Sequence, residues 1–234
     1  MTIDFYSAAG ETHIKEHLYN QDAVSFILSG ENGIAAALSD GAGASMMSAI
    51  GAHVNVQAVM NFFRIHNVES WLTMRDKFLA EDIMFAAANA CTDTSNLLRI
   101  SSEKLSATLL GIAAAGTEAA VFHIGDGAVA VLNNDSSVEC LSLPENRDRH
   151  NATWFTVDKD AIKHMRITRV DLTNAKALLL MSDGVYQGKE PLDAALELFA
   201  SLDDFSDFSS IELASVVKKL QLEDDHTIII LRTS

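Results

Sequence analysis

Five aspartates lie at the ends of short apolar segments of the length typical of buried strands. Asp40 and Asp183 each follow such a segment and each precede a glycine, and Asp22 stands just before another. Asp126 lies between two apolar segments, and Asp224 comes shortly before the last one. Carboxylates that meet at strand ends repel one another strongly unless cations lie between them. The carboxylates would supply oxygen ligands, and no cysteine or pair of histidines at zinc spacing accompanies them. Such a set favours hard ions, Mg²⁺ or Mn²⁺.

The stretch Ser39-Asp40-Gly41-Ala42-Gly43 shows this pattern most clearly. A single Asp-Gly pair is usually an ordinary turn. The same order, an apolar segment followed by Ser-Asp-Gly, returns at Ser182-Asp183-Gly184, and this repetition favours a shared site. Two cations about 4 Å apart could share a water and lower its pKa, which produces a nucleophile for in-line attack on phosphorus. No Gly-x-Ser-x-Gly elbow, P-loop or dinucleotide-binding fingerprint competes with this interpretation.

Composition narrows the class of protein. The 234 residues are 48% hydrophobic, which suits one globular domain over residues 1–234. A net charge of −15 disfavours binding to nucleic acid or anionic membranes. No apolar run is long enough to span a bilayer, and the first residues lack the features of a signal peptide. Two cysteines provide no disulfide framework, so we expect a reduced, cytoplasmic setting.

The elements that must position the aspartates follow from periodicity. Strands over 23–28 and 33–38, joined by a hairpin-type turn, would bring Asp22 and Asp40 to the same end of two neighbours. Segments 107–113, 119–124, 128–132 and 138–143 read as one antiparallel meander with Asp126 at a turn. Further strands are predicted over 3–8, 177–181 and 227–231, and helices over 46–66, 71–90, 190–202 and 209–220. Residues 10–17 are polar and are predicted to cross the surface. The polar segment 144–170 reads as an excursion from the sheet, a flap beside the site.

Six motifs occur in one order along nearly the whole chain. They are Asn20-Gln21-Asp22-Ala23, Ser39-Asp40-Gly41-Ala42-Gly43, Ser106-Ala107-Thr108, Ile124-Gly125-Asp126, Ser182-Asp183-Gly184-Val185 and Asp224-Asp225-His226-Thr227. Together they resemble the metal-dependent type 2C protein serine/threonine phosphatases. Residues 10–13 and Asn151-Ala152-Thr153-Trp154-Phe155 are similar to the bacterial branch of that family.

The resemblance implies a fold and a set of site residues. The fold would be α+β, a four-layer α-β-β-α sandwich of two antiparallel sheets flanked by helices. Asp40 would bridge two metal ions, the Gly41 carbonyl would bind one of them, and Asp183 and Asp224 would complete the first ion's shell. Asp126, together with Asp183, would belong to a third, weaker site. Asp22 would act near the second ion, mostly through waters. A hydroxide bridging two Mg²⁺ or Mn²⁺ ions would then attack the phosphate, so that Asp40, Asp183 and Asp224 are the catalytic set.

Four positions depart from the family pattern. Where many members carry a phosphate-holding arginine, this chain offers His13, Lys15 and His17. Lys15 could supply a point charge, and His13 could contact the phosphate or act as general acid. The other departures are Gln21 in place of a glutamate, Gly127 in place of a serine and Asp225 in place of an asparagine. We expect Asp225 to support the metal ligands.

Three functions remain open on the sequence alone. The first is hydrolysis of phosphoserine or phosphothreonine on proteins. The second is a catalytically weak or silent module of the same fold that binds phosphoprotein partners, and the third is an acidic structural protein whose Asp-Gly pairs are only turns. For the first, the expected partner is a phosphorylated protein, such as a Ser/Thr kinase or its target, and we expect a monomer. The physiological substrate cannot be read from the residues.

Overall fold

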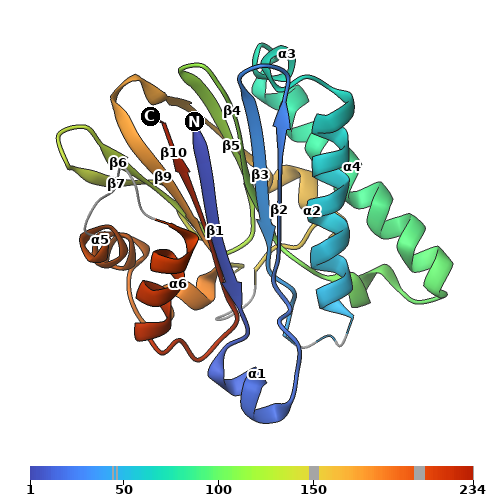
Figure 1. The fold of residues 1–234 in the computed structure, drawn as a ribbon. Helices are drawn as coiled ribbons and strands as arrows, with labels where there is room; N and C mark the ends of the chain where they lie inside the picture. The colour runs from blue at the N-terminus through green and yellow to red at the C-terminus, as the bar shows by residue number, and fades with distance from the viewer. Residues whose placement is uncertain (44, 46, 148–152, 203–208, 234) are drawn as a thin grey trace.

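The computed structural model describes residues 1–43, 45, 47–147, 153–202 and 209–233. Its strands form two five-stranded antiparallel sheets that face each other (Figure 1). The first sheet has the order β1 (Thr2–Ala8), β10 (His226–Arg232), β9 (Ala175–Met181), β6 (Ala128–Asn133) and β7 (Val138–Ser142). The second has the order β2 (Ala23–Ser29), β3 (Gly33–Ser39), β4 (Leu109–Ala115), β5 (Glu118–Ile124) and β8 (Arg166–Asp171).

Helices cover the outer face of each sheet, which completes the predicted α-β-β-α sandwich. The second sheet is covered by α2 (Ser48–Ile65), α3 (Val68–Leu72) and α4 (Asp76–Leu98), and the first sheet by α5 (Pro191–Ser201) and α6 (Ser210–Lys219) (Figure 1). The short α1 (Glu11–Glu16) lies at one end of the sandwich. Four 3₁₀ turns complete the elements: η1 (Ser102–Leu105), η2 (Ala161–Lys163), η3 (Leu172–Asn174) and η4 (Asp183–Val185).

The inner strands of the two sheets pack on both of their faces, which is why they read as continuous apolar runs. In β3, Ile34 and Leu38 belong to the core between the two sheets, whereas Ala35 and Ala37 pack toward the helices. This alternation follows from the two-residue period of a strand. Small alanines on the outer face of β3 let α2 lie close to the sheet, next to the point where Asp40 follows the strand.

Residues Gly125 to Gly127 carry the chain from one sheet to the other, so the predicted single meander is wrong. β5 belongs to the second sheet and β6 to the first. Gly125 has φ +121°, and a Cβ there would lie 2.6 Å from Thr108 Cβ, so this crossing requires glycine. Strands that are buried on both faces show no polar face by which the sequence could tell a hairpin from a crossing between sheets. The crossing places Asp126 between the two sheets.

Three local predictions also differ from the structure. The predicted helix 71–90 is two helices, α3 and α4, separated at residues 73–75, and α4 continues to Leu98. Residues 11–16, predicted only to cross the surface, lie at the surface and form the helix α1, which was not predicted. The excursion that begins at Pro144 ends before Arg166, because β8 pairs with β5 in the second sheet; we call residues 144–147 and 153–165 the flap. Residues 148–152 of the predicted flap lie outside the described residues.

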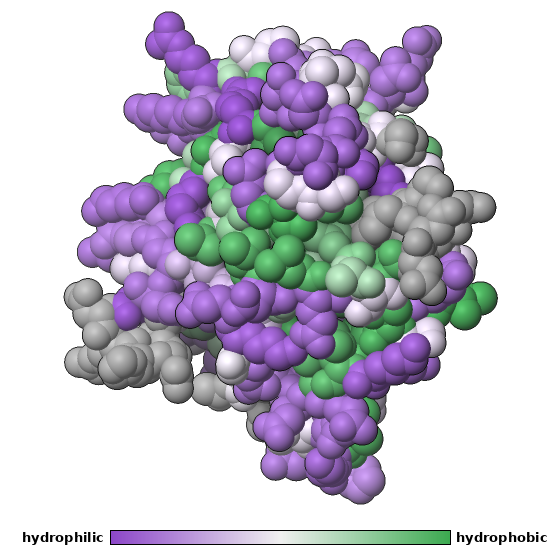
Figure 2. Space-filling model, turned by 90° about the vertical axis from the view of Figure 1, so that its left-hand side faces the viewer, coloured by the Kyte–Doolittle hydropathy of each residue, from purple (hydrophilic) through white to green (hydrophobic). Residues whose placement is uncertain are grey.

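One face of the molecule shows how polar and apolar residues are distributed on the surface. Figure 2, which views the side of the molecule that carries β7 and α5, shows hydrophilic residues over most of that face and an apolar area near its middle. Among the described residues, none of the helices has both the length and the apolar character that crossing a bilayer requires.

Candidate active site

The predicted aspartates come together at one end of the sandwich. Ala23 pairs with Ser39 across β2 and β3, so Asp22 and Asp40 are neighbours. On the other sheet, the Ser182 N–H donates to the Thr227 carbonyl at 3.0 Å, which joins the end of β9 to the start of β10. The pairing of β2 with β3 confirms the prediction that a hairpin brings Asp22 and Asp40 to the same end of two neighbouring strands.

A pocket of about 370 Å³ opens between these strand ends. Its lining residues are His13, Gln21, Asp40, Gly41, Ala42, Gly43, Thr108, Asp126, Thr153, Phe155, Asp183, Asp224 and Asp225. An adjoining cavity of about 450 Å³ shares Asp126, Asp183 and Asp224 with it. The predicted acidic residues that line the pocket come from both sheets, and the flap contributes Thr153 and Phe155 to its wall. Asp22 lies just beneath the wall: it is almost fully buried and accepts a hydrogen bond from Ser182 Oγ at 2.9 Å.

Asp40, Asp126 and Asp183 form the centre of the pocket, with one carboxylate oxygen of each within 4.8 Å of the others. Burial raises the pKa of Asp40 well above its ordinary value, and the charges of Asp22 and Asp183 raise it further. Burial, with the Asp183 charge, raises the pKa of Asp126 to about 7. Such carboxyls must either bind protons or share a cation.

The donor set fits a hard divalent cation. The buried Oδ1 of Asp22 has no hydrogen-bond partner among the described residues, and burial raises the pKa of Asp22 to about 7. Unpartnered buried oxygen is costly without a proton or a metal ion. Asp40, Gly41, Asp126 and Asp183 all line the pocket, and carboxylate and carbonyl oxygens suit Mg²⁺ or Mn²⁺.

The backbone of Asp40 is held from both sides by Thr108. The Asp40 N–H donates to Thr108 Oγ1 at 3.0 Å, and the Thr108 N–H donates to the Asp40 carbonyl at 2.8 Å. Gly41 pairs with Ala107 in an isolated bridge, and a Cβ at Gly41 would lie 2.9 Å from the Gln21 carbonyl oxygen. The Ser-Asp-Gly turn after β3 is therefore rigid and leaves no room for a side chain at its glycine.

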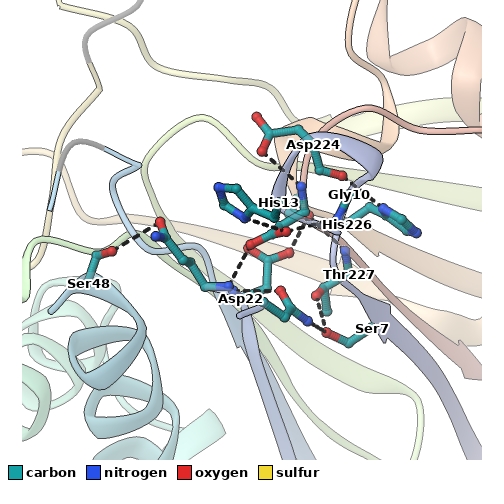
Figure 3. Close-up of polar contacts among 12 residues, drawn as sticks. Ser7, Gly10, His13, Asp22, Ser48, Asp224, His226 and Thr227 are labelled. Carbon is teal, nitrogen blue, oxygen red and sulfur yellow. Dashed lines mark hydrogen bonds and ion pairs between the residues drawn. The ribbon is translucent and has the colours of Figure 1, made fainter. Parts of the chain in front are cut away.

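Asp225 connects three separate segments at the edge of the pocket. Its Oδ1 accepts from the Gly10 N–H at 2.9 Å, and its Oδ2 accepts from the Gln21 N–H at 2.5 Å. His13 Nδ1 lies 2.8 Å from Asp225 Oδ1. Asp225 itself is only 4% exposed. Figure 3 shows Gly10, His13 and Asp22 gathered around these contacts, with Asp224 beside them.

Of the three cationic candidates in the N-terminal segment, only His13 lines the pocket. Lys15 is exposed and pairs with Glu11 at 3.0 Å on the surface of α1. His17 ends α1 in a left-handed conformation, with φ 58°. Lys15 is not among the residues that line the pocket, so its contact with phosphate stays a prediction.

Tyr186 was not predicted as part of the site. Its hydroxyl donates to the carbonyl oxygen of Asp126, and burial, followed by the charges of Asp183 and Asp126, raises the pKa of the phenol. Tyr186 follows Asp183 by one 3₁₀ turn, η4. Only this turn geometry brings the ring back onto Asp126, so the sequence carried no signal for it.

Comparisons with known proteins agree with this geometry. A family model described as protein phosphatase 2C matches residues 9–221. The solved structure of serine/threonine phosphatase Stp1 from Staphylococcus aureus has a TM-score of 0.75 and 16% identity, and the match covers 100% of this chain and 95% of that chain. For the serine/threonine phosphatase of S. agalactiae the TM-score is 0.73 at 13% identity, with 100% and 99% covered.

PppA from Pseudomonas aeruginosa gives a TM-score of 0.73 at 17% identity, with 99% of this chain and 96% of that chain covered. A comparison with curated proteins finds no match to the chain. The solved structures, all at low identity, show that this chain shares their fold. The family model extends over most of the sequence. The six ordered motifs, the converging aspartates and the matching family model together show that this chain belongs to the protein phosphatase 2C family.

Proposed function

We propose that this protein is a metal-dependent phosphatase that hydrolyses phosphoserine and phosphothreonine in proteins. The observation that carries the proposal is the convergence of Asp40, Asp126 and Asp183, with carboxylate oxygens within 4.8 Å of one another, in a chain of the protein phosphatase 2C family. The names of two structural neighbours, both serine/threonine phosphatases, support the same substrate class.

The residues present would hold two or three Mg²⁺ or Mn²⁺ ions. Asp40 and the Gly41 carbonyl, with Asp183 and Asp224, would provide the ligands of the central pair. Asp126 and Asp183 also face the adjoining cavity, where a third ion would bind. When bound, these ions supply charge neutralisation and an activated water.

The protein's own groups would orient the phosphate ester. His13 lines the pocket, and its Nδ1 lies against the Asp225 carboxylate, so its other ring nitrogen would be the one that meets an incoming phosphate or leaving oxygen. There it would contact the phosphate or protonate the serine or threonine alkoxide. Thr153 and Phe155 of the flap close one side of the pocket and would limit access of bulk water.

The substrate would be a phosphorylated protein instead of a small metabolite, since two structural neighbours are named serine/threonine phosphatases. A Ser/Thr kinase or the target of such a kinase is the partner that this activity implies. We propose that the protein acts as a monomer in the cytoplasm, where such substrates occur.

Turnover of p-nitrophenyl phosphate and of a phosphothreonine peptide, with Mn²⁺ and with chelator, tests the proposal. We expect turnover by the wild type that depends on Mn²⁺ and is lost in Asp40→Asn. Turnover that persists in chelator would contradict the metal-dependent mechanism. Binding of the phosphopeptide without turnover would favour the alternative, a silent module that recognises phosphorylated partners.

A further inference from the structure

A buried polar network lies directly beneath Asp40, centred on Asn55 of α2. The Asn55 side chain is 0% exposed. Its Nδ2 donates to Ser39 Oγ and to the Thr108 carbonyl, both at 3.3 Å. Ser39 is the residue before Asp40, and Thr108 is the residue that holds the Asp40 backbone. Asn55 is thus one contact away from the loop that carries the central carboxylate.

The oxygen of the same amide is also fully used. Asn55 Oδ1 accepts from Thr156 Oγ1 at 3.1 Å and from Cys91 Sγ at 3.3 Å. The Thr156 hydroxyl also lies 3.4 Å from the Ala107 carbonyl oxygen, so Asn55 Oδ1 is the nearer of its two acceptors. An asparagine amide has two donor hydrogens and two acceptor positions, and all four have partners here. Burial raises the pKa of the Cys91 thiol to about 11, so this group stays protonated and remains a donor. One side chain therefore joins α2, α4, the Asp40 loop and the flap.

Thr156 connects the flap to the loop by a second route. Its N–H donates to the Ala107 carbonyl at 3.0 Å, and Ala107 pairs with Gly41. Thr156 is 1% exposed and Thr108 is 4% exposed. Thr156 follows Phe155, which lines the catalytic pocket, but Thr156 itself is not among the pocket's lining residues.

The hydrogen bonds of Asn55 are strengthened by their burial. In a buried site of low effective dielectric, hydrogen bonds polarise one another, and an unpaired member is costly. Loss of the Thr156 hydroxyl would remove one of the two hydrogen bonds that Asn55 Oδ1 accepts. The amide could then rotate, and its two donor contacts to Ser39 and to the Thr108 carbonyl would weaken.

We propose that Asn55 and Thr156 are positioning residues for the Asp40 loop, and that the flap controls the affinity of the metal site through them. The proposal rests on the proposed metal site at Asp40 but not on turnover. A change at a buried hydroxyl of the flap then alters metal binding at carboxylates that it does not touch. A purely structural role for Thr156 would lower stability and leave the affinity for metal unchanged.

Three variants separate the two roles. Thr156→Val keeps the shape of the side chain and removes the hydroxyl, whereas Thr156→Ser keeps the hydroxyl. Ser95→Ala is the control, because Ser95 is a buried hydroxyl of α4 whose Oγ donates to the Thr92 carbonyl at 2.8 Å, outside the network. The affinity of each full-length protein for Mn²⁺ is measured by titration calorimetry, and thermal unfolding without metal reports the loss of stability.

We expect Thr156→Val to bind Mn²⁺ about tenfold more weakly, which is the lower end of the effect of residues that support metal ligands. Thr156→Ser should restore the affinity to within about twofold, and Ser95→Ala should bind as the wild type does. Wild-type affinity in Thr156→Val, or an equal loss in Ser95→Ala, would overturn the proposal. If the wild type itself bound no Mn²⁺, the proposed function would fail, and this proposal with it.

Discussion

His13 Nδ1 lies 2.8 Å from Asp225 Oδ1, although the two residues belong to opposite ends of the chain. The same carboxylate accepts backbone hydrogen bonds from Gly10 and Gln21. One nearly buried side chain therefore fixes the end of β1, the start of α1 and the approach to β2. His13 therefore lies against a residue next to Asp224, at the other end of the sequence, and we expect this contact to set the orientation of its ring.

Although asparagine is the residue of the family pattern at this position, Asp225→Asn should lower kcat/KM for a phosphothreonine peptide by about 10- to 100-fold, because both carboxylate oxygens accept from backbone N–H groups in this chain. The asparagine amide keeps one oxygen acceptor. Its NH₂ group would face either the Gly10 N–H or the Gln21 N–H, so that one of these two hydrogen bonds is lost. Steady-state kinetics with Mn²⁺ measure the effect. Asp93→Asn, the same change at an exposed position of α4, should leave the kinetics unchanged. An Asp225→Asn enzyme with wild-type kinetics would show that this contact does not orient His13.

His13→Gln should reduce kcat by at least about tenfold, because His13 is the only one of the three N-terminal candidates that lines the pocket and a positioned proton donor typically contributes that much or more. Lys15→Gln is the matched control: it removes an exposed charge from the same helix, and we expect activity within about twofold of the wild type. A larger loss for Lys15→Gln than for His13→Gln would reverse the assignment.

Asp183→Ala and Asp40→Ala should each reduce turnover by at least about a hundredfold, since each removes a ligand of the proposed ions. Their stability without metal should stay equal or increase, because each change removes one of several repelling carboxylates. Urea unfolding in chelator measures the stability. Near-normal turnover in either variant would exclude the proposed ligand set.

The stability of the metal-free protein should fall as the pH rises from about 4 to about 7. Burial raises the pKa values of Asp22 and Asp126 from 3.8 to about 7. Protons therefore bind the folded state more tightly than the unfolded state, and this stabilisation is complete below about 4 and disappears as the pH passes about 7. At about 1.4 kcal/mol per unit of pKa shift, the expected loss is several kcal/mol.

Urea unfolding in chelator across this pH range tests the effect. Asp22→Asn should show a flatter profile, because the amide does not titrate. Saturating Mn²⁺ should restore stability at the upper end of the range, where protons no longer compete for the carboxylates. A metal-free wild type whose stability rises steadily from pH 4 to pH 7 would contradict the raised pKa values.

Gly184→Ala should destabilise the protein by about 2 kcal/mol or more, since the new Cβ would lie 2.0 Å from the Asp225 carbonyl oxygen and the backbone would have to move. Gly43→Ala is the comparison, because a Cβ at Gly43 meets no atom of the described residues within 4 Å. Denaturant unfolding distinguishes the two. Equal stability of both variants would mean that the strand ends around Asp183 and Asp225 are less tightly packed than the structure shows.

The periodicity of apolar residues predicts many of the helices and strands. Period-two and helical spacing located the β2–β3 hairpin and helices α2, α5 and α6 to within about two residues. The flap boundary was wrong because β8 is an edge strand with half-exposed, polar residues, so it has no apolar run to identify it. The break between α3 and α4 was missed because both helices carry apolar residues at compatible spacing.

By itself, the sequence determined which residues could serve as oxygen ligands, that they stand at strand ends, and to which family their order belongs. Only the tertiary structure decided that Gly125–Gly127 crosses between sheets, that His13 lines the pocket and Lys15 does not, and that Asn55 connects the flap to Ser39 and Thr108 beside Asp40. Strand ends and turns can be predicted because they depend on neighbours in the chain. The other three features depend on how the two sheets and their helices pack together.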